Sequence, residues 1–226
     1  MSVSTPPPPV PSKKKGWGCF GCGCLVLIAI VALILALCGL GGYSAYHKIL
    51  ANTSNTPASV PTPPVTDDFY QSVVQKVEDF SHDVKNHQPA SLQLSSDEIN
   101  ALLMRDPYLS SHNAKLFIVL SGDEASIQGS IPCDSISSFH GFSGRYANFS
   151  GTTGITFDST NHSLSFPIHT LEIGDKALPQ NAMPLMQAES AAIVNPLLLG
   201  NPDIKDLLAQ AKSIRIANGN FIVETQ

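Results

Sequence analysis

The residues best suited to chemistry in this sequence are three cysteines near its N-terminus. Cys19, Cys22 and Cys24 have the spacing of thiolate ligands to a metal ion. A zinc site normally uses four ligands, however, and the sequence supplies no fourth one nearby. Cysteines at a membrane boundary can also be acylated, and small side chains suit such a boundary without any modification. The sequence does not decide whether these cysteines are modified, and we predict no metal and no cofactor.

Two further segments come close to a nucleotide-binding or a catalytic pattern, but neither meets its requirements. The glycines of 16–21 fit G-x-G-x-x-G, but that fingerprint needs a strand before it and a helix that receives a pyrophosphate after it. The segment 141–145 falls short of a nucleophile elbow, because Arg145 occupies the position of the final glycine. We therefore predict no catalytic residue and expect a protein that is not an enzyme.

A long apolar segment separates the cysteines from the rest of the chain. The 32 residues between Lys15 and Lys48 carry no formal charge. From Leu25 to Tyr46 the segment would span about 33 Å as a helix, enough to cross a bilayer. The lysines lie mostly on its N-terminal side, which predicts a cytoplasmic N-terminus and an exported C-terminal part. The residues that set this topology are Lys13, Lys14 and Lys15.

Other interpretations of the apolar segment stay open. It could be a signal peptide that is cleaved near residues 42–44, or a lipoprotein signal that ends on Cys38. Each alternative also exports the C-terminal part. Small residues form a seam along one face of the predicted membrane helix, which favours a homodimer because helices with such seams approach closely. The seam consists of Ala29, Ala32, Ala36 and Gly39.

Composition divides the 226 residues into four parts. We predict a disordered Pro-rich cytoplasmic tail over 1–15, a transmembrane segment with interfacial flanks over 16–48, a Pro/Thr/Ser linker over 49–66 and an exported domain over 67–226. The domain carries 18 acidic and nine basic side chains, a net charge of −9. An acidic domain repels phosphate backbones, so nucleic-acid binding is not expected. Its single cysteine, Cys133, is expected to be buried.

The pattern of the domain predicts an α+β fold with an antiparallel sheet packed by helices. A first helix is expected after Thr66 and a second after Ser95, where Glu98 completes the spacing of a capping box; Pro107 should end the second helix. Later helices are predicted at 183–194 and 203–212. Strands are predicted at 115–121, 125–131, 146–149, 154–158, 163–168, 213–217 and 220–224, and the last two form a hairpin around Asn218-Gly219.

Three stretches of the domain resemble a known family. The first is Ser95-Ser-Asp-Glu-Ile-Asn-Ala-Leu-Leu103, which is similar to the opening motif of the YpmS-like family. The stretch from Asn161 to Gly174, followed by Leu178-Pro179, and the closing hairpin follow the same order. The resemblance spans residues 67–226 and implies a bacterial single-pass protein whose exported domain is akin to tubular lipid-binding domains. The family supplies no catalytic residues, and it lacks the Pro-rich tail and the cysteine-rich membrane entry.

These observations together predict a single-pass cell-membrane protein with a non-enzymatic exported domain. The expected ligand is a lipid or another apolar molecule, or a partner protein of the cell envelope. One alternative is a structural or assembly protein of the envelope that acts through self-association. Another is an exported lipoprotein or a secreted domain that is released after signal cleavage.

Overall fold

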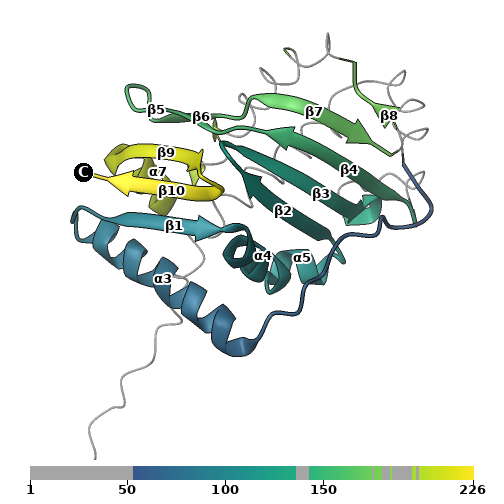
Figure 1. Cartoon of the computed structure of the whole chain (residues 1–226), viewed down its shortest axis with the longest axis horizontal. Helices are drawn as coiled ribbons and strands as arrows, with labels where there is room; N and C mark the ends of the chain where they lie inside the picture. The colour runs from purple at the N-terminus through teal and green to yellow at the C-terminus, as the bar shows by residue number, and fades with distance from the viewer. Residues whose placement is uncertain (1–52, 136–142, 175, 180–183, 185–194, 197–198) are drawn as a thin grey trace, which may run out of the picture.

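The computed structural model describes residues 53–135, 143–174, 176–179, 184, 195–196 and 199–226. Within this part, helices pack on antiparallel sheets, which confirms the predicted α+β class (Figure 1). No helix among the described residues is long and apolar enough to cross a bilayer. The predicted membrane segment and the helix predicted at 183–194 lie outside the described residues, apart from Pro184.

The first described helix, α3 (Asp67–Lys85), forms as its sequence predicts. The Thr66 hydroxyl accepts a hydrogen bond from the Phe69 amide at 3.3 Å, and two aspartates occupy the favourable first turn. Apolar residues recur every three or four positions, so they share one face. That face is buried and consists of Val73, Val77, Phe80 and Val84.

A three-stranded sheet joins the start of the domain to its end. β1 (Ser91–Ser95) pairs antiparallel with β10 (Asn220–Thr225), which pairs with β9 (Ala211–Ala217). The β9–β10 turn is the predicted Asn218-Gly219, with φ of +52° and +73°, as a two-residue type I′ turn requires. α7 (Pro202–Gln210) leads directly into β9, so the helix predicted at 203–212 ends two residues early.

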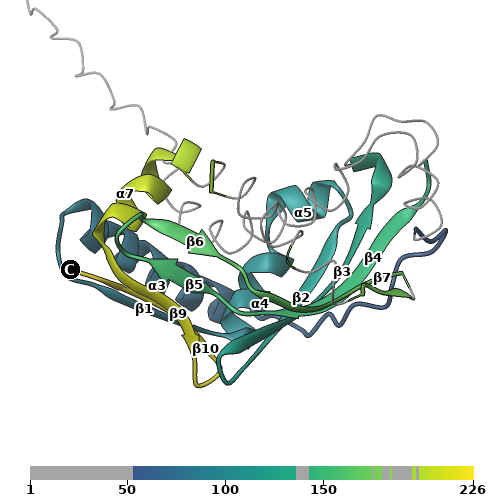
Figure 2. The same ribbon diagram turned by 90° about the horizontal axis from the view of Figure 1, so that it is seen from above.

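The larger sheet has five strands in the order β2 (Lys115–Ser121), β3 (Glu124–Pro132), β4 (Tyr146–Thr153), β7 (Ile168–Ile173) and β8 (Lys176–Ala177). The sheet is curved, and the short helices α4 (Ser96–Met104) and α5 (Pro107–Ser111) lie on its inner side (Figure 2). A β-bulge between Thr152 and Thr153 interrupts the β4–β7 pairing, and such bulges bend sheets. A 3₁₀ turn, η2 (Cys133–Ser135), follows β3.

Several predicted element boundaries are wrong. The strand predicted at 146–149 continues to Thr153, and the strand predicted at 154–158 begins at Thr156. The strand predicted at 163–168 is split into β6 (Ser163–Ser165), which pairs with β5 (Thr156–Asp158), and the separate strand β7. Pro167 lies between them and has no N–H for a ladder, which explains the break. Pro107 also does more than follow the second helix: it is the first residue of α5, a position that suits proline because the missing N–H would have no helical partner.

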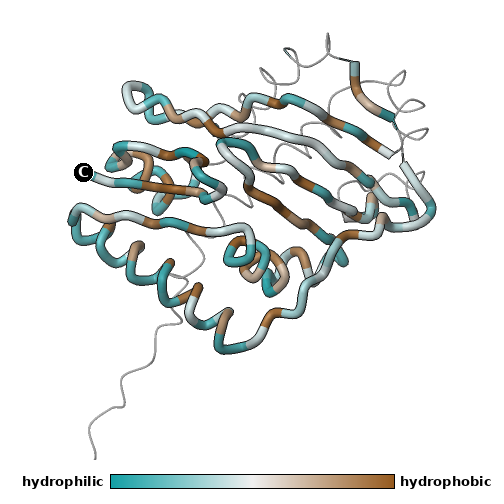
Figure 3. The backbone as a smooth tube through the Cα atoms, in the orientation of Figure 1, coloured by the Kyte–Doolittle hydropathy of each residue, from teal (hydrophilic) through white to brown (hydrophobic). Residues whose placement is uncertain are grey.

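The core fills the space between the helices and the inner faces of both sheets. Apolar residues concentrate on β1, β2 and β10 (Figure 3). In β2, Leu116, Ile118 and Leu120 are buried, whereas Val119 between them is 42% exposed. They share one core cluster with buried residues of α4 and α7, including Leu208, which is fully buried. Cys133 is 6% exposed, which confirms that it is a buried thiol.

The edge of β2 that faces away from β3 forms hydrogen bonds with side chains of α4 instead of with a neighbouring strand. Asn100 in α4 is 1% exposed. Its Nδ2 donates to the Ile118 carbonyl oxygen at 2.7 Å, and its Oδ1 accepts from the Ile118 amide at 2.9 Å. The Ser96 hydroxyl accepts from the Leu120 amide at 2.8 Å. The capping box that orients α4 is formed as predicted by Ser95 and Glu98. Backbone groups that would be left unpaired at a buried edge are therefore satisfied.

One ion pair in the terminal hairpin gives a prediction about pH. The Arg215 guanidinium and the Ser213 hydroxyl lower the pKa of Glu224 from 4.5 to about 2, and two Arg215 nitrogens reach its carboxylate at 2.8 and 3.1 Å. A lowered pKa in the folded state stabilises the fold above pH 4.5, and this contribution disappears as the pH falls toward 2. We expect Glu224→Gln to be less stable than the native chain at pH 7, with the difference closing between pH 5 and pH 2 in urea titrations. A difference that stays constant over this range would contradict the pairing.

Candidate functional site

Residues Thr53–Val60, which we call the strap, lie across the outer side of the curved sheet, opposite α4 and α5 (Figure 2). They belong to the segment 49–66, which the sequence predicts to be a linker outside the exported domain. Instead, every described residue of the strap lies close to the sheet, and Val60 is only 8% exposed. The strap therefore forms part of the folded domain.

The first residues of the strap are held by the start of β4. The Arg145 guanidinium donates to the Thr53 hydroxyl at 2.5 Å, to the Thr53 carbonyl oxygen at 2.5 Å and to Asn55 Oδ1 at 2.9 Å. Ser54 and Tyr146 exchange backbone hydrogen bonds of 2.9 and 2.7 Å, as two residues of neighbouring strands do. Bonds from a guanidinium are charge-assisted and are stronger than bonds between neutral groups.

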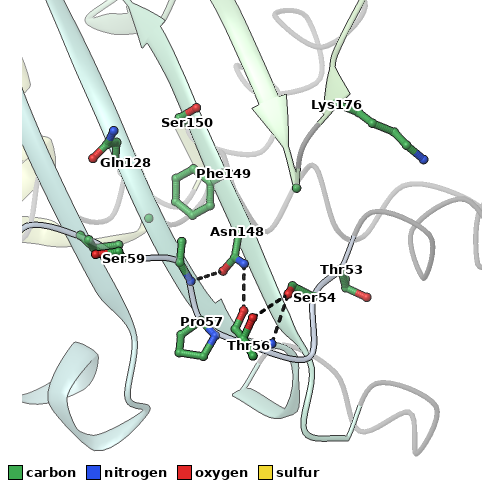
Figure 4. Close-up of a pocket in the computed structure, with 14 residues that line it drawn as sticks. Thr53, Ser54, Thr56, Pro57, Ser59, Gln128, Asn148, Phe149, Ser150 and Lys176 are labelled. Atoms are coloured by element: carbon green, nitrogen blue, oxygen red, sulfur yellow. Dashed lines mark hydrogen bonds between the residues drawn. The ribbon is translucent and has the colours of Figure 1, made fainter.

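The middle of the strap is held by two polar side chains on the outer face of the sheet. Asn148 accepts a hydrogen bond from the Ala58 amide at 2.9 Å and donates to the Thr56 carbonyl oxygen at 3.0 Å (Figure 4). Ser130, 1% exposed, donates to Asn148 at 2.8 Å. Both lie opposite the core because their neighbours in sequence, Ile131 and Ala147, point inward. A polar side chain under an extended segment thus satisfies backbone groups of that segment.

A hollow of about 550 Å³ opens between the strap and the sheet (Figure 4). Its polar lining comes from side chains of the strap, β3 and β4, with Lys176 at the β7–β8 turn pointing away from the strap. No carboxylate, imidazole or thiol occurs among its fourteen described lining residues. The hollow offers hydroxyl and amide groups that can bind hydrogen-bonding groups, and Lys176 is the one ionisable side chain among its described lining residues. The residues that contribute those groups are Thr53, Ser54, Thr56, Ser59, Gln128, Asn148 and Ser150.

Three further groups in the described part of the chain have pKa values that are shifted away from neutral pH: Cys133, Glu98 and Asp158. Burial raises the pKa of the Cys133 thiol, which makes it less reactive. Burial opposes ionisation of Glu98, but its hydrogen bonds with Lys76 and the Ser95 amide outweigh this effect and lower the pKa. Hydrogen bonds from Asn161 and Thr160 lower the pKa of Asp158. Among the described residues, no group of three or more His, Cys, Asp or Glu side chains could hold a metal ion.

The structure does not describe the sites that the sequence singled out. The cysteines, topology-setting lysines, membrane boundaries and helix-pairing seam all lie within residues 1–52, outside the described residues. These residues are Lys13, Lys14, Lys15, Cys19, Cys22, Cys24, Leu25, Ala29, Ala32, Ala36, Gly39 and Tyr46. Of the rejected nucleophile elbow, Arg145 bonds to the strap and the Gly144 amide donates to Asp134 at 2.9 Å.

Sequence reasoning missed the residues that hold the strap. Thr53 and Arg145 are 92 positions apart, and Ala58 and Ser130 are 72 apart. No local pattern links residues at such distances. The sequence offers one indication. Ser130 and Asn148 are polar residues in strands whose neighbours Ile131 and Ala147 face the core, so both side chains lie on the outer face of the sheet.

Comparison of the chain with protein-family models, with curated proteins and with solved structures found no significant match.

The contacts of the strap predict a local effect of one substitution. Ala58→Pro removes the N–H that bonds to Asn148 and Ser130 but changes no residue of the sheet. Because a hydrogen bond is worth about 1 kcal/mol, we expect the Ser54 and Tyr146 amides to exchange with deuterium about fivefold faster. Ala58→Ser keeps the N–H and should leave both rates unchanged. Equal exchange in the two variants would show that this bond does not hold the strap.

Proposed function

We propose that this chain is a single-pass membrane protein whose non-enzymatic exported domain binds a lipid or another apolar molecule next to the bilayer. The strap is the observation that carries the proposal. It ties the domain to the segment that leads to the predicted membrane helix. A domain that only needed to be exported would not require its linker to be bound in this way.

Absence of catalysis is part of the proposal and is supported by the chemistry of the described residues. The described lining of the hollow beneath the strap contains hydroxyl and amide groups and no carboxylate, imidazole or thiol. General acids and bases work best when their pKa lies near the working pH, whereas the pKa values of Glu98 and Cys133 are shifted away from it.

The proposed kinship with the YpmS-like family concerns the fold. In the stretch from Ser95 to Leu103, Ser95 and Glu98 form the capping box, and Ser96 and Asn100 bond to the edge of β2. These are structural roles. The resemblance therefore supports a similar sheet edge, and it supports a similar ligand only by analogy.

A described surface that suits an apolar ligand lies on β7 and on the residue that follows β8. Ile168 and Leu171 form an apolar cluster apart from the main core, and Ile173 and Leu178 pack against it while partly exposed. Apolar surface that remains accessible beside a core is a common feature of ligand sites. A lipid chain would bury it without requiring a charged partner.

The test uses the full chain, because truncation at residue 60 would remove the strap. Native mass spectrometry of the chain extracted from membranes should detect bound lipid. We expect Leu178→Asn to reduce the bound fraction severalfold, whereas Ala177→Asn on the neighbouring exposed residue should not. Anchorage is measured separately, by retention of the chain in membranes after alkaline carbonate extraction. Native chain that carries no lipid would contradict the apolar ligand, and extraction by carbonate would contradict the anchor.

A further inference from the structure

The strap shortens the free connection between the predicted membrane helix and the domain. That helix is predicted to end at Tyr46, and the first held residue of the strap is Thr53. Seven residue steps extend over at most about 25 Å. If the strap were not bound, the next fixed element would be α3, which begins at Asp67; the connection could then extend over about 70 Å.

The strap also enters the domain at one end of the curved sheet. At this end β2 begins, β3 ends and β4 begins, because Lys115 pairs with Ser130 and Pro132 pairs with Tyr146. The β5–β6 turn lies at the opposite end of the molecule (Figure 1). A domain of this size is about 40 Å across, which is longer than the free connection. An orientation with the β5–β6 turn against the bilayer and the strap entry farthest from it is therefore beyond the reach of the free connection.

Charge differs between the two ends of the same strands. The cations Lys115, Arg145 and Lys176 lie near the end at which the strap enters, together with the acids Asp134 and Glu172. The other end carries Asp123 and Glu124 at the β2–β3 turn, and Glu124 pairs with His169 at 2.6 Å. Cations near a bilayer are attracted by anionic headgroups, whereas carboxylates are repelled. The charge distribution and the short tether favour the same orientation.

We infer that the end of the sheet marked by Lys115, Arg145 and Lys176 faces the phospholipid headgroups of the bilayer that holds the chain's own membrane helix. This inference rests on the proposed membrane anchorage. The bound strap fixes this end next to the headgroups and holds the hollow between the strap and the sheet close to the surface. The β5–β6 turn points away from the membrane.

Energy transfer in nanodiscs tests the orientation. The full chain is reconstituted in phosphatidylcholine and phosphatidylglycerol with an acceptor dye on the headgroups. A donor dye is attached to an encoded azide-bearing residue at Ser143 or at Ser159, since native cysteines make thiol labelling ambiguous. Both positions are exposed. We expect transfer from position 143 to be about twofold higher than from position 159, given the tether and the domain size.

A flexible insertion placed on either side of the strap tests the role of the strap. About twelve Gly/Ser residues inserted after Ala51 lengthen the free connection by up to about 40 Å and should remove most of the difference in transfer. The same insertion after Thr62 lies behind the bound strap and should preserve the difference. Equal effects of the two insertions would overturn the role of the strap.

The experiment separates this inference from the proposed function. If the chain does not co-purify with nanodiscs, the membrane anchor itself is refuted. If it co-purifies but positions 143 and 159 give equal transfer, the anchor stands and the orientation is refuted. Circular dichroism of each variant confirms that the domain is folded before transfer is compared.

Discussion

Replacing Asn100 with leucine should lower the free energy of unfolding by about 3 kcal/mol, because the Ile118 amide and carbonyl would both lose their partner in a buried position. Urea unfolding of the full chain in mild detergent, followed by circular dichroism, measures the loss. Tryptophan fluorescence is not suitable, because Trp17, the only tryptophan, lies outside the domain. Ser96→Ala, which removes one bond to the same edge, should cost about 1 kcal/mol. Equal effects of the two substitutions would contradict the special role of Asn100.

Asn100→Asp separates hydrogen bonding from packing, because the side chain keeps its shape. The carboxylate could still accept from the Ile118 amide, but it could not donate to the Ile118 carbonyl oxygen, which it would repel. Burial favours the neutral acid, and the neutral acid can donate again. We therefore expect the stability deficit relative to the native chain to shrink as the pH is lowered toward about 4. A deficit independent of pH would indicate a packing effect.

Replacing Gly151 with alanine should lower the free energy of unfolding by about 2 kcal/mol. A Cβ atom at this position would lie 2.5 Å from the Thr170 carbonyl oxygen on the neighbouring strand. The obstacle is backbone, so β4 and β7 would have to separate next to the bulge. Loss of the β4–β7 pairing should also appear as faster deuterium exchange in β7.

Gly200→Ala is the matched control for this substitution. A Cβ atom there would meet nothing within 4 Å. We expect a change of less than about 1 kcal/mol, and a stabilising one if any, because alanine restricts the unfolded chain more than glycine does. If both alanine variants were equally stable, the close approach of β4 and β7 at Gly151 would not be a constraint on the fold.

The sequence predicts those parts of the fold that depend on neighbouring residues. The capping box at Ser95 and Glu98 involves residues three positions apart, and the Asn218-Gly219 turn needs only two adjacent residues. Both interactions are encoded locally and are present as predicted. The face of α3 follows from helical periodicity alone.

Elements that depend on distant partners could not be predicted in the same way. The short stretch 92–94 has apolar residues at both ends, but its role as the strand β1 depends on β10, since Leu92 pairs with Val223. The candidate site depends on contacts of the same kind, because Arg145 and Asn148 have no local feature that indicates a partner in the strap. The break at Pro167 could have been found, because a proline within a predicted strand argues against continuity.

The pairing of β1 with β10 has a consequence for the order in which the chain folds. Ser91 pairs with Glu224, so β1 stays without its partner strand until nearly all of the domain has been synthesised. Contacts between residues so far apart in sequence slow folding, because a long loop must close first. The strap likewise cannot form its hydrogen bonds until Arg145 and β4 have been synthesised. We therefore expect the newly made chain to pass through a period in which β1 and the strap binding surface are open to chaperones and to proteases.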